Sequence, residues 1–214
     1  MTKFVRAVLT ALALATGLTA GILSADAGGD KARQAATGPT ATAIFAGGCF
    51  WCVESDFDKV KGVVATQSGY TGGHVANPTY QQVSHENTGH YEAVKVTYDP
   101  ARVSYRTLVD YFFRHVDPTD AGGQFCDRGE SYRTAIFVGD EAQREAAEAA
   151  KADAAAALHE AIVTPIEAAG PFYPAEDYHQ DYYEKNPLKY RYYRWNCGRD
   201  ARVEEVWGKA HTPS

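Results

Sequence analysis

The sequence predicts an α+β domain: a two-layer α/β sandwich with a mixed, largely antiparallel sheet and a long, mostly irregular C-terminal wrap. Three observations indicate this class. Helical and strand periodicities are mixed along one chain of 214 residues, the strand pattern is hairpin-like, and this length suits a single domain. No internal repeat is present. We place the domain at residues 42–214.

The N-terminal residues resemble a targeting segment rather than part of this domain. A short basic start precedes an uncharged Ala/Leu-rich run from Ala7 to Leu23, and Ala25-Asp26-Ala27 offers a small-x-small cleavage pattern. An uncleaved anchor is the alternative, but the run holds several Thr and Gly, whereas a spanning helix needs about 20 strongly apolar residues. We expect residues 1–27 to be a signal peptide and residues 28–41 a flexible linker. The protein is then exported, periplasmic or secreted, without a stable membrane anchor.

The first elements of the domain follow from apolar spacing. Ala43–Ala46 suits a strand, which Gly47-Gly48 ends. Apolar residues at i, i+4 and i+7 between residues 53 and 60 indicate a helix. A second strand is predicted at Val63–Gln67, closed by a glycine-rich turn over residues 69–73.

The middle of the domain adds two helices and two strands. Asn77-Pro78 is a helix-start signal, with Asn as N-cap. His90 to Tyr98 alternates as a strand, and Tyr132 to Val138 is another. Ser104 can cap an amphipathic helix. Its apolar face would comprise Leu108, Val109, Phe112, Phe113 and Val116.

Two segments close the chain. Residues 141–161 are Ala-rich with high helix propensity, which predicts a covering, solvated helix. Residues 172–195 hold seven of the fourteen Tyr and are expected to wrap the core in mostly irregular form.

Composition excludes several classes of function. The formal net charge is −6, from 21 Lys+Arg and 27 Asp+Glu, so no basic face is expected to bind nucleic acid. Four Cys are too few for a disulfide scaffold in a chain of this length. The cysteines therefore call for a chemical explanation.

Cys49 is the first candidate for chemistry. It follows Gly47-Gly48 and precedes a predicted helix, so its thiol lies at a helix N-terminus, where free N–H groups favour an anion. Such a position lowers a cysteine pKa and gives a nucleophilic thiolate. A buried structural Cys is the alternative, which the flanking glycines disfavour.

The other three cysteines leave several possibilities open. Cys49 and Cys52 form a C-x-x-C pair, which indicates a redox dithiol, half of a zinc site or coincidence. Metal is the weakest of these, because Cys126 and Cys197 lie far apart and alone. Cys197 has Gly beside it near the C-terminus, and an exposed, mobile thiol there could resolve a sulfenic acid.

Glu92 is the second candidate. By strand parity it shares a face with Val94 and Val96, the apolar face of its strand. A carboxyl facing the core has a raised pKa and can serve as a general acid near neutral pH. The alternative is that the strand end frays and Glu92 turns to water.

Five further residues are functional candidates only in combination with Cys49 and Glu92. Phe50 and Trp51 pack in the core by default, but beside a nucleophile they could wall a pocket for a methyl or thioether group. Tyr80 and Tyr132 follow turns, and phenols can donate to a developing oxyanion. Asp127 is most simply a turn acid.

Taken together, these residues resemble the A-type peptide methionine sulfoxide reductases. The resemblance covers about residues 42–208, and its separated motifs keep the family's order. They are Gly47-Gly48-Cys49-Phe50-Trp51, Gly69-Tyr70-Thr71-Gly72-Gly73, Asn77-Pro78-Thr79-Tyr80, Gly89-His90-Tyr91-Glu92-Ala93-Val94, Asp127-Arg128-Gly129 with Tyr132-Arg133, and Glu176-Asp177-Tyr178-His179-Gln180.

The resemblance implies roles at matching positions. Cys49 is the nucleophile that attacks the sulfoxide sulfur, and Glu92 is the acid that protonates its oxygen. Tyr80 and Tyr132 bind that oxygen, and Asp127 helps to hold the site. Phe50 and Trp51 form the methyl pocket. Cys197 matches the C-terminal resolving thiol, whose disulfide a thioredoxin-like dithiol then reduces.

The resemblance also implies the reaction and its partners. The family reduces the S epimer of methionine sulfoxide, free or in oxidised proteins, and so repairs proteins under oxidative stress. It uses no metal or organic cofactor. We expect a monomer that binds no nucleic acid.

Two positions depart from the commonest family pattern. Position 52 is frequently Gly and position 126 is usually not a thiol, yet both are Cys here. Cys52 and Cys126 could pair as a structural or relay disulfide, or Cys52 could compete with Cys197 as the resolving thiol. We expect Cys197 to resolve.

Two functions of other classes stay open on the sequence. A general thiol–disulfide oxidoreductase would use Cys49 and Cys52, and it predicts that Cys52→Ser abolishes activity. A non-enzymatic module that binds methionine-containing segments in an aromatic pocket predicts that Cys49→Ser leaves its function intact.

Overall fold

Within the residues that the computed structural model describes (36, 38–85 and 87–208), one sheet of six strands forms the centre of the domain. Its strand order is β7-β6-β1-β3-β2-β8. The neighbours pair antiparallel except β6 and β7, which are parallel, so the sheet is mixed and largely antiparallel as predicted. The strands are β1 (Ala41–Gly47), β2 (Val63–Thr71), β3 (Tyr91–Tyr98), β6 (Thr134–Val138), β7 (Ile166–Ala168) and β8 (Tyr173–Pro174).

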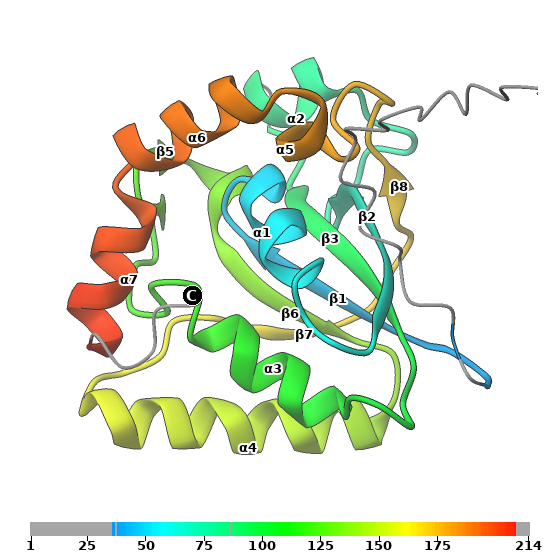
Figure 1. The fold of residues 1–214 in the computed structure, drawn as a ribbon, viewed down its shortest axis with the longest axis vertical. Coiled ribbons are helices and arrows are strands. Elements are labelled where there is room, and N and C mark those ends of the chain that lie inside the picture. Colours follow the sequence, from blue (N-terminus) through cyan, green and yellow to red (C-terminus); the bar gives the residue numbers. More distant parts are fainter. Residues whose placement is uncertain (1–35, 37, 86, 209–214) are drawn as a thin grey trace, which may run out of the picture. The chain divides into compact units, whose positions relative to one another are not determined.

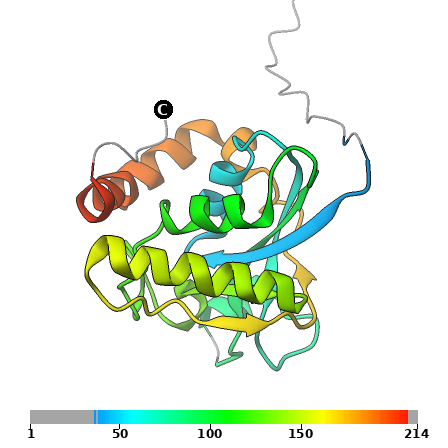
Figure 2. The ribbon, with the colours of Figure 1, turned by 90° about the horizontal axis from the view of Figure 1, so that it is seen from below.

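Helices pack against one face of this sheet and make the second layer (Figures 1 and 2). The predicted Ser104 cap is confirmed: its hydroxyl accepts the Thr107 N–H, and a helix follows. The helices are α1 (Phe50–Phe57), α2 (Tyr80–His85), α3 (Tyr105–Phe113), α4 (Glu141–Leu158), α5 (Tyr182–Lys185), α6 (Pro187–Asn196) and α7 (Arg199–Trp207). A short hairpin of β4 (Gly123–Gln124) and β5 (Asp127–Arg128) leads into a 3₁₀ turn, η1 (Glu130–Tyr132).

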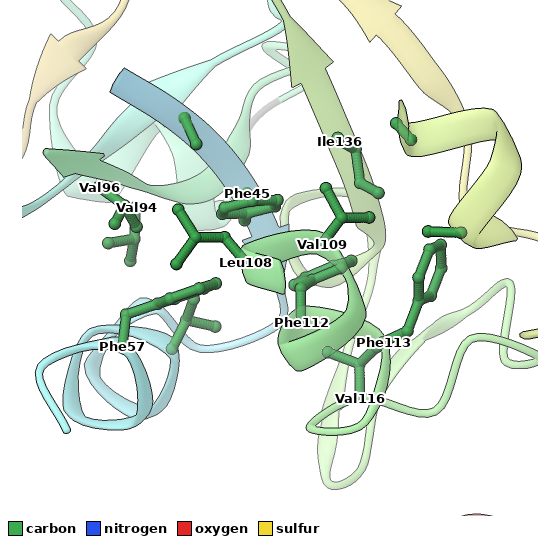
Figure 3. Packing of buried hydrophobic residues seen from close by; sticks show 14 of the residues in the cluster. Phe45, Phe57, Val94, Val96, Leu108, Val109, Phe112, Phe113, Val116 and Ile136 are labelled. Carbon is green, nitrogen blue, oxygen red and sulfur yellow. The ribbon is translucent and has the colours of Figure 1, made fainter. Parts of the chain in front are cut away.

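The main core lies between the central strands and the helices (Figure 3). Phe45 of β1 is fully buried, with its ring centroid 4.9 Å from that of Phe57 on α1 and 5.2 Å from that of Phe112 on α3. Val94 and Val96 of β3 face the same core, as parity predicted. Because α1 packs on this face of the sheet, its N-terminus lies next to the C-terminal end of β1.

Several boundaries differ from the sequence prediction. Strand β2 continues to Thr71, so the turn expected at residues 69–73 begins too early. Gly69 is required inside the strand because a Cβ there would lie 2.5 Å from the Tyr173 carbonyl oxygen of β8. Helix α2 begins at Tyr80 rather than after Asn77, and the Thr79 hydroxyl accepts the Gln82 N–H.

The C-terminal segment is more regular than predicted. Residues 172–195 contain β8, α5 and most of α6 as well as irregular backbone. Tyr132 lies in η1 rather than at the start of β6. Both differences arise because these residues pack around the site described below, a tertiary effect that local periodicity does not report.

The predicted signal peptide, residues 1–27, lies outside the described residues, as does most of the predicted linker. Ala41, the last residue of the predicted linker, is the first residue of β1 in the structure. Among the residues described, none of the helices combines the length and apolar character needed to cross a membrane.

Candidate active site

The loop between β1 and α1 places Cys49 at the N-cap of the helix. Gly48 has φ +79°, and a Cβ there would lie 2.6 Å from Cβ of Gln124. Gly47 is also crowded, with three side-chain atoms 3.0–3.1 Å from the position of a Cβ. Gly48 is therefore needed for both conformation and space, and Gly47 for space.

Glu92 of β3 faces the N-terminus of α1. Its side chain is 2% exposed, and its Oε2 accepts the Phe50 N–H at 3.0 Å. Burial raises the pKa of Glu92 to about 8; the Asp127 and Cys52 charges add to the rise, and the Phe50 N–H opposes it. The expectation of a core-facing carboxyl with a raised pKa is confirmed.

Cys49 differs from its predicted ionisation. The thiol is 6% exposed, and burial raises its pKa well above the ordinary value, with Cys52 and Glu92 contributing and a hydrogen bond with Tyr193 opposing. The prediction of an accessible thiolate at a helix N-terminus is therefore wrong for this state. Burial is the main reason, and the N–H of Phe50, the first residue of α1, does not offset it because this group binds Glu92.

Cys52 lies one helical turn from Cys49, and the two thiols are hydrogen-bonded. That hydrogen bond lowers the pKa of Cys52, burial opposes the change, and the nearby Arg199 and Arg194 guanidiniums lower the pKa further. Of the two sulfurs, Cys52 therefore holds negative charge more readily. Cys49 and Cys52 are both free thiols.

The phenols predicted to bind the oxygen lie together beside these groups. The Tyr80 and Tyr132 hydroxyls hydrogen-bond to each other, and burial together with the Glu92 charge raises both pKa values. Both hydroxyls therefore stay protonated donors at neutral pH. Asp127 is partly buried, which raises its pKa, and its carboxylate accepts a hydrogen bond from the Tyr193 hydroxyl.

These side chains surround one cavity of about 70 Å³. It brings together every residue predicted for catalysis or substrate binding, from five separate segments of the chain. The lining comprises Cys49, Phe50, Trp51, Tyr80, Glu92, Asp127, Tyr132 and Tyr193.

Trp51 is held in a fixed orientation at the cavity wall. Its ring stacks on Tyr182 at a centroid distance of 3.8 Å, and its Nε1–H donates to His179 Nδ1 at 3.0 Å. Burial lowers the pKa of His179, which keeps the ring neutral and able to accept. The wall is thus rigid and apolar, suited to a small methyl or thioether group.

The C-terminal motif at residues 176–180 holds the cavity walls in place. Glu176 accepts the Tyr80 N–H at 2.9 Å through Oε1 and the Tyr70 hydroxyl at 2.9 Å through Oε2. Gln180 accepts the Ser68 N–H and donates to the Ser68 carbonyl, both at 2.9 Å. The wrap thus orients Tyr80 and, through His179, Trp51.

The remaining cysteines are joined. Cys126 and Cys197 form a disulfide, so the suggested Cys52–Cys126 pair is wrong. The physical reason is placement: Cys52 lies on the buried face of α1, whereas Cys126 is exposed on the turn between β4 and β5. Cys197 is half-buried at the end of α6 instead of free and mobile.

Among the described residues, one group of three potential ligands lies close enough to share a metal ion: Cys126, Asp127 and Cys197, within 4.8 Å. Its two sulfurs are bonded to each other and offer no thiolate.

Three residues of the site were missed by sequence reasoning. Tyr193, His179 and Arg199 contact the cavity or its support from the C-terminal segment. His179 lies inside a motif quoted for the family resemblance, so that signal was available. Tyr193 is one tyrosine among fourteen and Arg199 follows no motif, so neither had a local signal.

The arrangement places a thiol opposite a protonated carboxyl and two phenol donors, within a cavity walled by aromatic rings. A group with a polar oxygen on a sulfur or carbon centre and a small apolar substituent would fit between them. The carboxyl can give a proton to that oxygen while the thiol sulfur attacks the centre.

Comparison with known proteins agrees with this chemistry. The profile of the family described as "Peptide methionine sulfoxide reductase" matches residues 41–211. A Caulobacter vibrioides relative, "Peptide methionine sulfoxide reductase MsrA 2", is 55% identical over 84% of this chain and 92% of its own. A Rhizobium meliloti relative with the same description is 58% identical over 78% of this chain and 83% of its own.

Solved structures of similar fold agree as well. Reduced Mxr1 from Saccharomyces cerevisiae has a TM-score of 0.68 at 31% identity, covering 74% of this chain and 92% of that one. Methionine sulfoxide reductase A of Corynebacterium diphtheriae has a TM-score of 0.63 at 38% identity, covering 70% and 76%.

Proposed function

The chain belongs to the peptide methionine sulfoxide reductases and is an enzyme that reduces methionine sulfoxide to methionine; we propose that it acts on the S epimer, with Cys49 as nucleophile and Glu92 as acid. The observation that carries this proposal is the shared cavity, in which the Cys49 thiol and a carboxyl with a pKa of about 8 face the same space. The substrates are free methionine sulfoxide and oxidised proteins.

The first half of the reaction uses groups that line the cavity. Cys49 Sγ attacks the sulfoxide sulfur while Glu92 protonates the sulfoxide oxygen, and the Tyr80 and Tyr132 hydroxyls donate hydrogen bonds to that oxygen. The hydrogen bond to Cys52 gives the Cys49 proton a place to go. Methionine leaves, and the oxygen stays on Cys49 as a sulfenic acid. The Cys49 sulfur thereby loses the two electrons that the sulfoxide sulfur gains.

The supporting residues fit this step. Trp51 and Phe50 accept the methyl group, and the hydrogen bond to His179 fixes the Trp51 ring. Asp127 holds Tyr193, whose hydroxyl also reaches Cys49. A substrate oriented in this way presents its oxygen to the acid and its sulfur to the thiol.

The second half regenerates the thiol. We propose that Cys197, once reduced, attacks the Cys49 sulfenic sulfur and releases water, which leaves a Cys49–Cys197 disulfide. A thioredoxin-like dithiol supplies the electrons. Cys52 is the competing resolving thiol, since it already contacts Cys49.

Each epimer of a methionine sulfoxide peptide, incubated with dithiothreitol and the protein, tests the proposal. Conversion of the S epimer alone is expected, and Cys49→Ser should abolish it. Conversion of neither epimer contradicts the proposed reaction, and conversion of the R epimer alone contradicts its stereochemistry. A module that only binds would convert neither.

We also propose that the protein is exported and works as a monomer. The support for export is the basic start, apolar run and small-x-small site before residue 28. N-terminal sequencing of the protein recovered from cell fractions should find a chain that begins near Gly28 outside the cytoplasm. A full-length chain retained inside would contradict export, and light scattering would detect a dimer.

A further inference from the structure

The four cysteines fall into two pairs of different accessibility. Cys49, which lines the cavity, and Cys52 are buried free thiols, whereas Cys126, bonded to Cys197, is exposed. In this state the inner pair is reduced and the outer pair is oxidised. A large soluble reductant can reach only an exposed sulfur, so Cys126 is the point at which it can engage.

The outer disulfide lies directly behind the cavity wall. Asp127, which lines the cavity, follows Cys126 in sequence, and its carboxylate oxygens lie 3.8 Å from both disulfide sulfurs. The same carboxylate accepts a hydrogen bond from Tyr193, one helical turn before Cys197. Two residues, Asp127 and Tyr193, therefore connect the disulfide to Cys49.

Cys197 also lies at a junction that leads to the nucleophile loop. It ends α6, and Gly198, with φ +70° and open space around it, separates it from α7. The next residue, Arg199, donates to the Gly47 carbonyl at 3.1 Å, two residues before Cys49. The Arg199 guanidinium also lies 4.7 Å from the centre of the Phe125 ring, next to Cys126. A reduced Cys197 is thus held near Cys49, with a glycine beside it that permits rotation.

We infer that Cys126 is the recycling cysteine of this enzyme: it withdraws the oxidising equivalents from Cys49 through Cys197 and presents them to the reductant as the Cys126–Cys197 disulfide. This inference rests on the proposed function and extends it. It assigns a chemical role to a cysteine that the family pattern does not anticipate.

The electron and atom balance is complete. Cys197 attacks the Cys49 sulfenic sulfur, water leaves, and a Cys49–Cys197 disulfide forms. The Cys126 thiol loses its proton, and the thiolate attacks Cys197 Sγ. This attack forms Cys126–Cys197 and releases Cys49 as a thiolate, which takes up the proton that Cys126 lost. The reductant's first thiolate attacks Cys126 Sγ and expels Cys197; its second thiol then cleaves the mixed disulfide, and the reductant leaves oxidised.

The direction of the last attack follows from the surroundings of the disulfide. Cys126 is the exposed residue of the pair and Cys197 is half-buried, and the Cys126 N–H points to Cys197 Sγ at 3.1 Å. That N–H stabilises a thiolate on Cys197 when the bond breaks, so Cys197 is the better leaving group.

Counting methionine without added reductant tests the inference. The full-length chain is reduced with dithiothreitol, desalted and given excess S-sulfoxide peptide. Wild type should form two methionines per chain: the first equivalent moves to Cys126–Cys197, and the regenerated Cys49 reacts once more. Cys126→Ser and Cys197→Ser should each form one. Asn196→Ala, the matched variant beside Cys197 on the exposed end of α6, keeps both cysteine pairs and should still form two.

Each other result has a definite meaning. One methionine per wild-type chain overturns the inference and leaves the proposed function standing, because Cys49 has reacted without passing its oxidation on. No methionine from wild type contradicts the proposed function instead. Two methionines from Cys126→Ser overturn the inference as well.

Mapping and trapping locate the sulfur. After one equivalent of sulfoxide, peptide mapping should find Cys126–Cys197 with Cys49 and Cys52 alkylated; a Cys49–Cys197 bond at that stage would overturn the inference. A thioredoxin that lacks its second active-site Cys should be trapped on Cys126. Trapping on Cys197 or Cys49, or thioredoxin-supported turnover of Cys126→Ser within twofold of wild type, would contradict it; we expect at least a tenfold loss.

Discussion

Glu92 and Cys49 both lie at the positive N-terminal end of α1, and Glu92 accepts the hydrogen bond from its first residue. The Phe50 N–H donates to Glu92 Oε2 at 3.0 Å, while the Cys49 thiol stays buried with a raised pKa. The Glu92 carboxyl is thereby aimed into the cavity, and the Cys49 thiol rests uncharged. A buried, uncharged thiol is less open to random oxidation than an exposed thiolate.

The ionisation of Glu92 should appear directly in the chemistry. Single-turnover methionine formation by wild type and by Glu92→Gln, measured from pH 6 to 10, should differ by about 100-fold or more while Glu92 is protonated. Above pH about 8 the ratio of the two rates should fall, because Glu92 then loses its proton. The ratio cancels any ionisation of the thiols. A ratio that stays constant across this range would exclude Glu92 as the acid.

The buried Glu92 carboxyl should also lower the free energy of unfolding as the pH rises. Its folded pKa of about 8 lies above the ordinary value of 4.5, so between these values the unfolded chain releases a proton that the folded chain keeps. Unfolding is therefore favoured progressively from pH 4.5 to 8, by ~1.4 kcal/mol per pH unit at most. Urea unfolding of Glu92→Gln should show greater stability than wild type at pH 8 and equal stability at pH 4. Equal stability at both pH values would contradict this account.

Gly48 permits a test of the nucleophile loop with a matched control. Gly48→Ala combines φ +79° with a Cβ 2.6 Å from Cβ of Gln124, whereas Gly129→Ala combines φ +114° with open space. Gly129→Ala should lose about 1 kcal/mol of unfolding free energy and Gly48→Ala distinctly more, because only the latter displaces neighbouring atoms. Gly48→Ala should also lower kcat. Equal losses in the two variants would show that the clash is relieved.

A buried ion cluster of Asp56, Arg194 and Arg199 stabilises helix α1. The Asp56 carboxylate lies 2.9 Å from an Arg194 nitrogen and 3.7 Å from an Arg199 nitrogen, and Arg199 is 2% exposed. The cluster ties α1 to α6 and α7, and both arginines also lower the pKa of Cys52. One set of charges therefore supports the helix and the inner cysteine pair.

Removal of one partner should reveal this support. Arg199→Met should lower the free energy of unfolding by about 3 kcal/mol or more, because it leaves part of the Asp56 charge buried and unpaired. In the double variant with Asp56→Asn the added cost of Arg199→Met should be smaller by about 1–3 kcal/mol. Chemical denaturation of the four proteins completes the cycle. Strict additivity would mean that the two side chains are not coupled.

Across the whole domain, the outer disulfide joins the β4–β5 turn to the end of α6. The two cysteines are 71 residues apart, and closing a loop of that length stabilises a fold by about 4 kcal/mol in the chain-entropy description. The bond therefore contributes to stability as well as chemistry. The reduced enzyme should be the less stable form.

Guanidinium unfolding with and without dithiothreitol separates these contributions. Oxidised wild type should be more stable than reduced wild type by about 2–4 kcal/mol. Cys126→Ser should match the reduced wild type and not respond to dithiothreitol. If Cys126→Ser were far less stable than the reduced protein, the Cys126 side chain itself would be essential for packing.

The sequence predicted the main features that depend on local order, although it misplaced the end of β2 and the start of α2. Strand parity assigned Glu92 to the core face, the Gly47-Gly48 pair marked the turn before Cys49, and Ser104 marked a helix start. The motif order identified the family, and the predicted catalytic and binding residues all line one cavity. Short-range spacing carries this information because side-chain direction repeats with the backbone.

The tertiary structure decided what depends on contacts between distant segments. Burial rather than helix position set the ionisation of Cys49, Cys197 paired with Cys126 rather than remaining free, and Tyr193, His179 and Arg199 joined the site. Desolvation, disulfide pairing and ion clusters depend on which groups meet in space. Residues 71 to 152 positions apart in the chain meet only after the sheet and helices have packed.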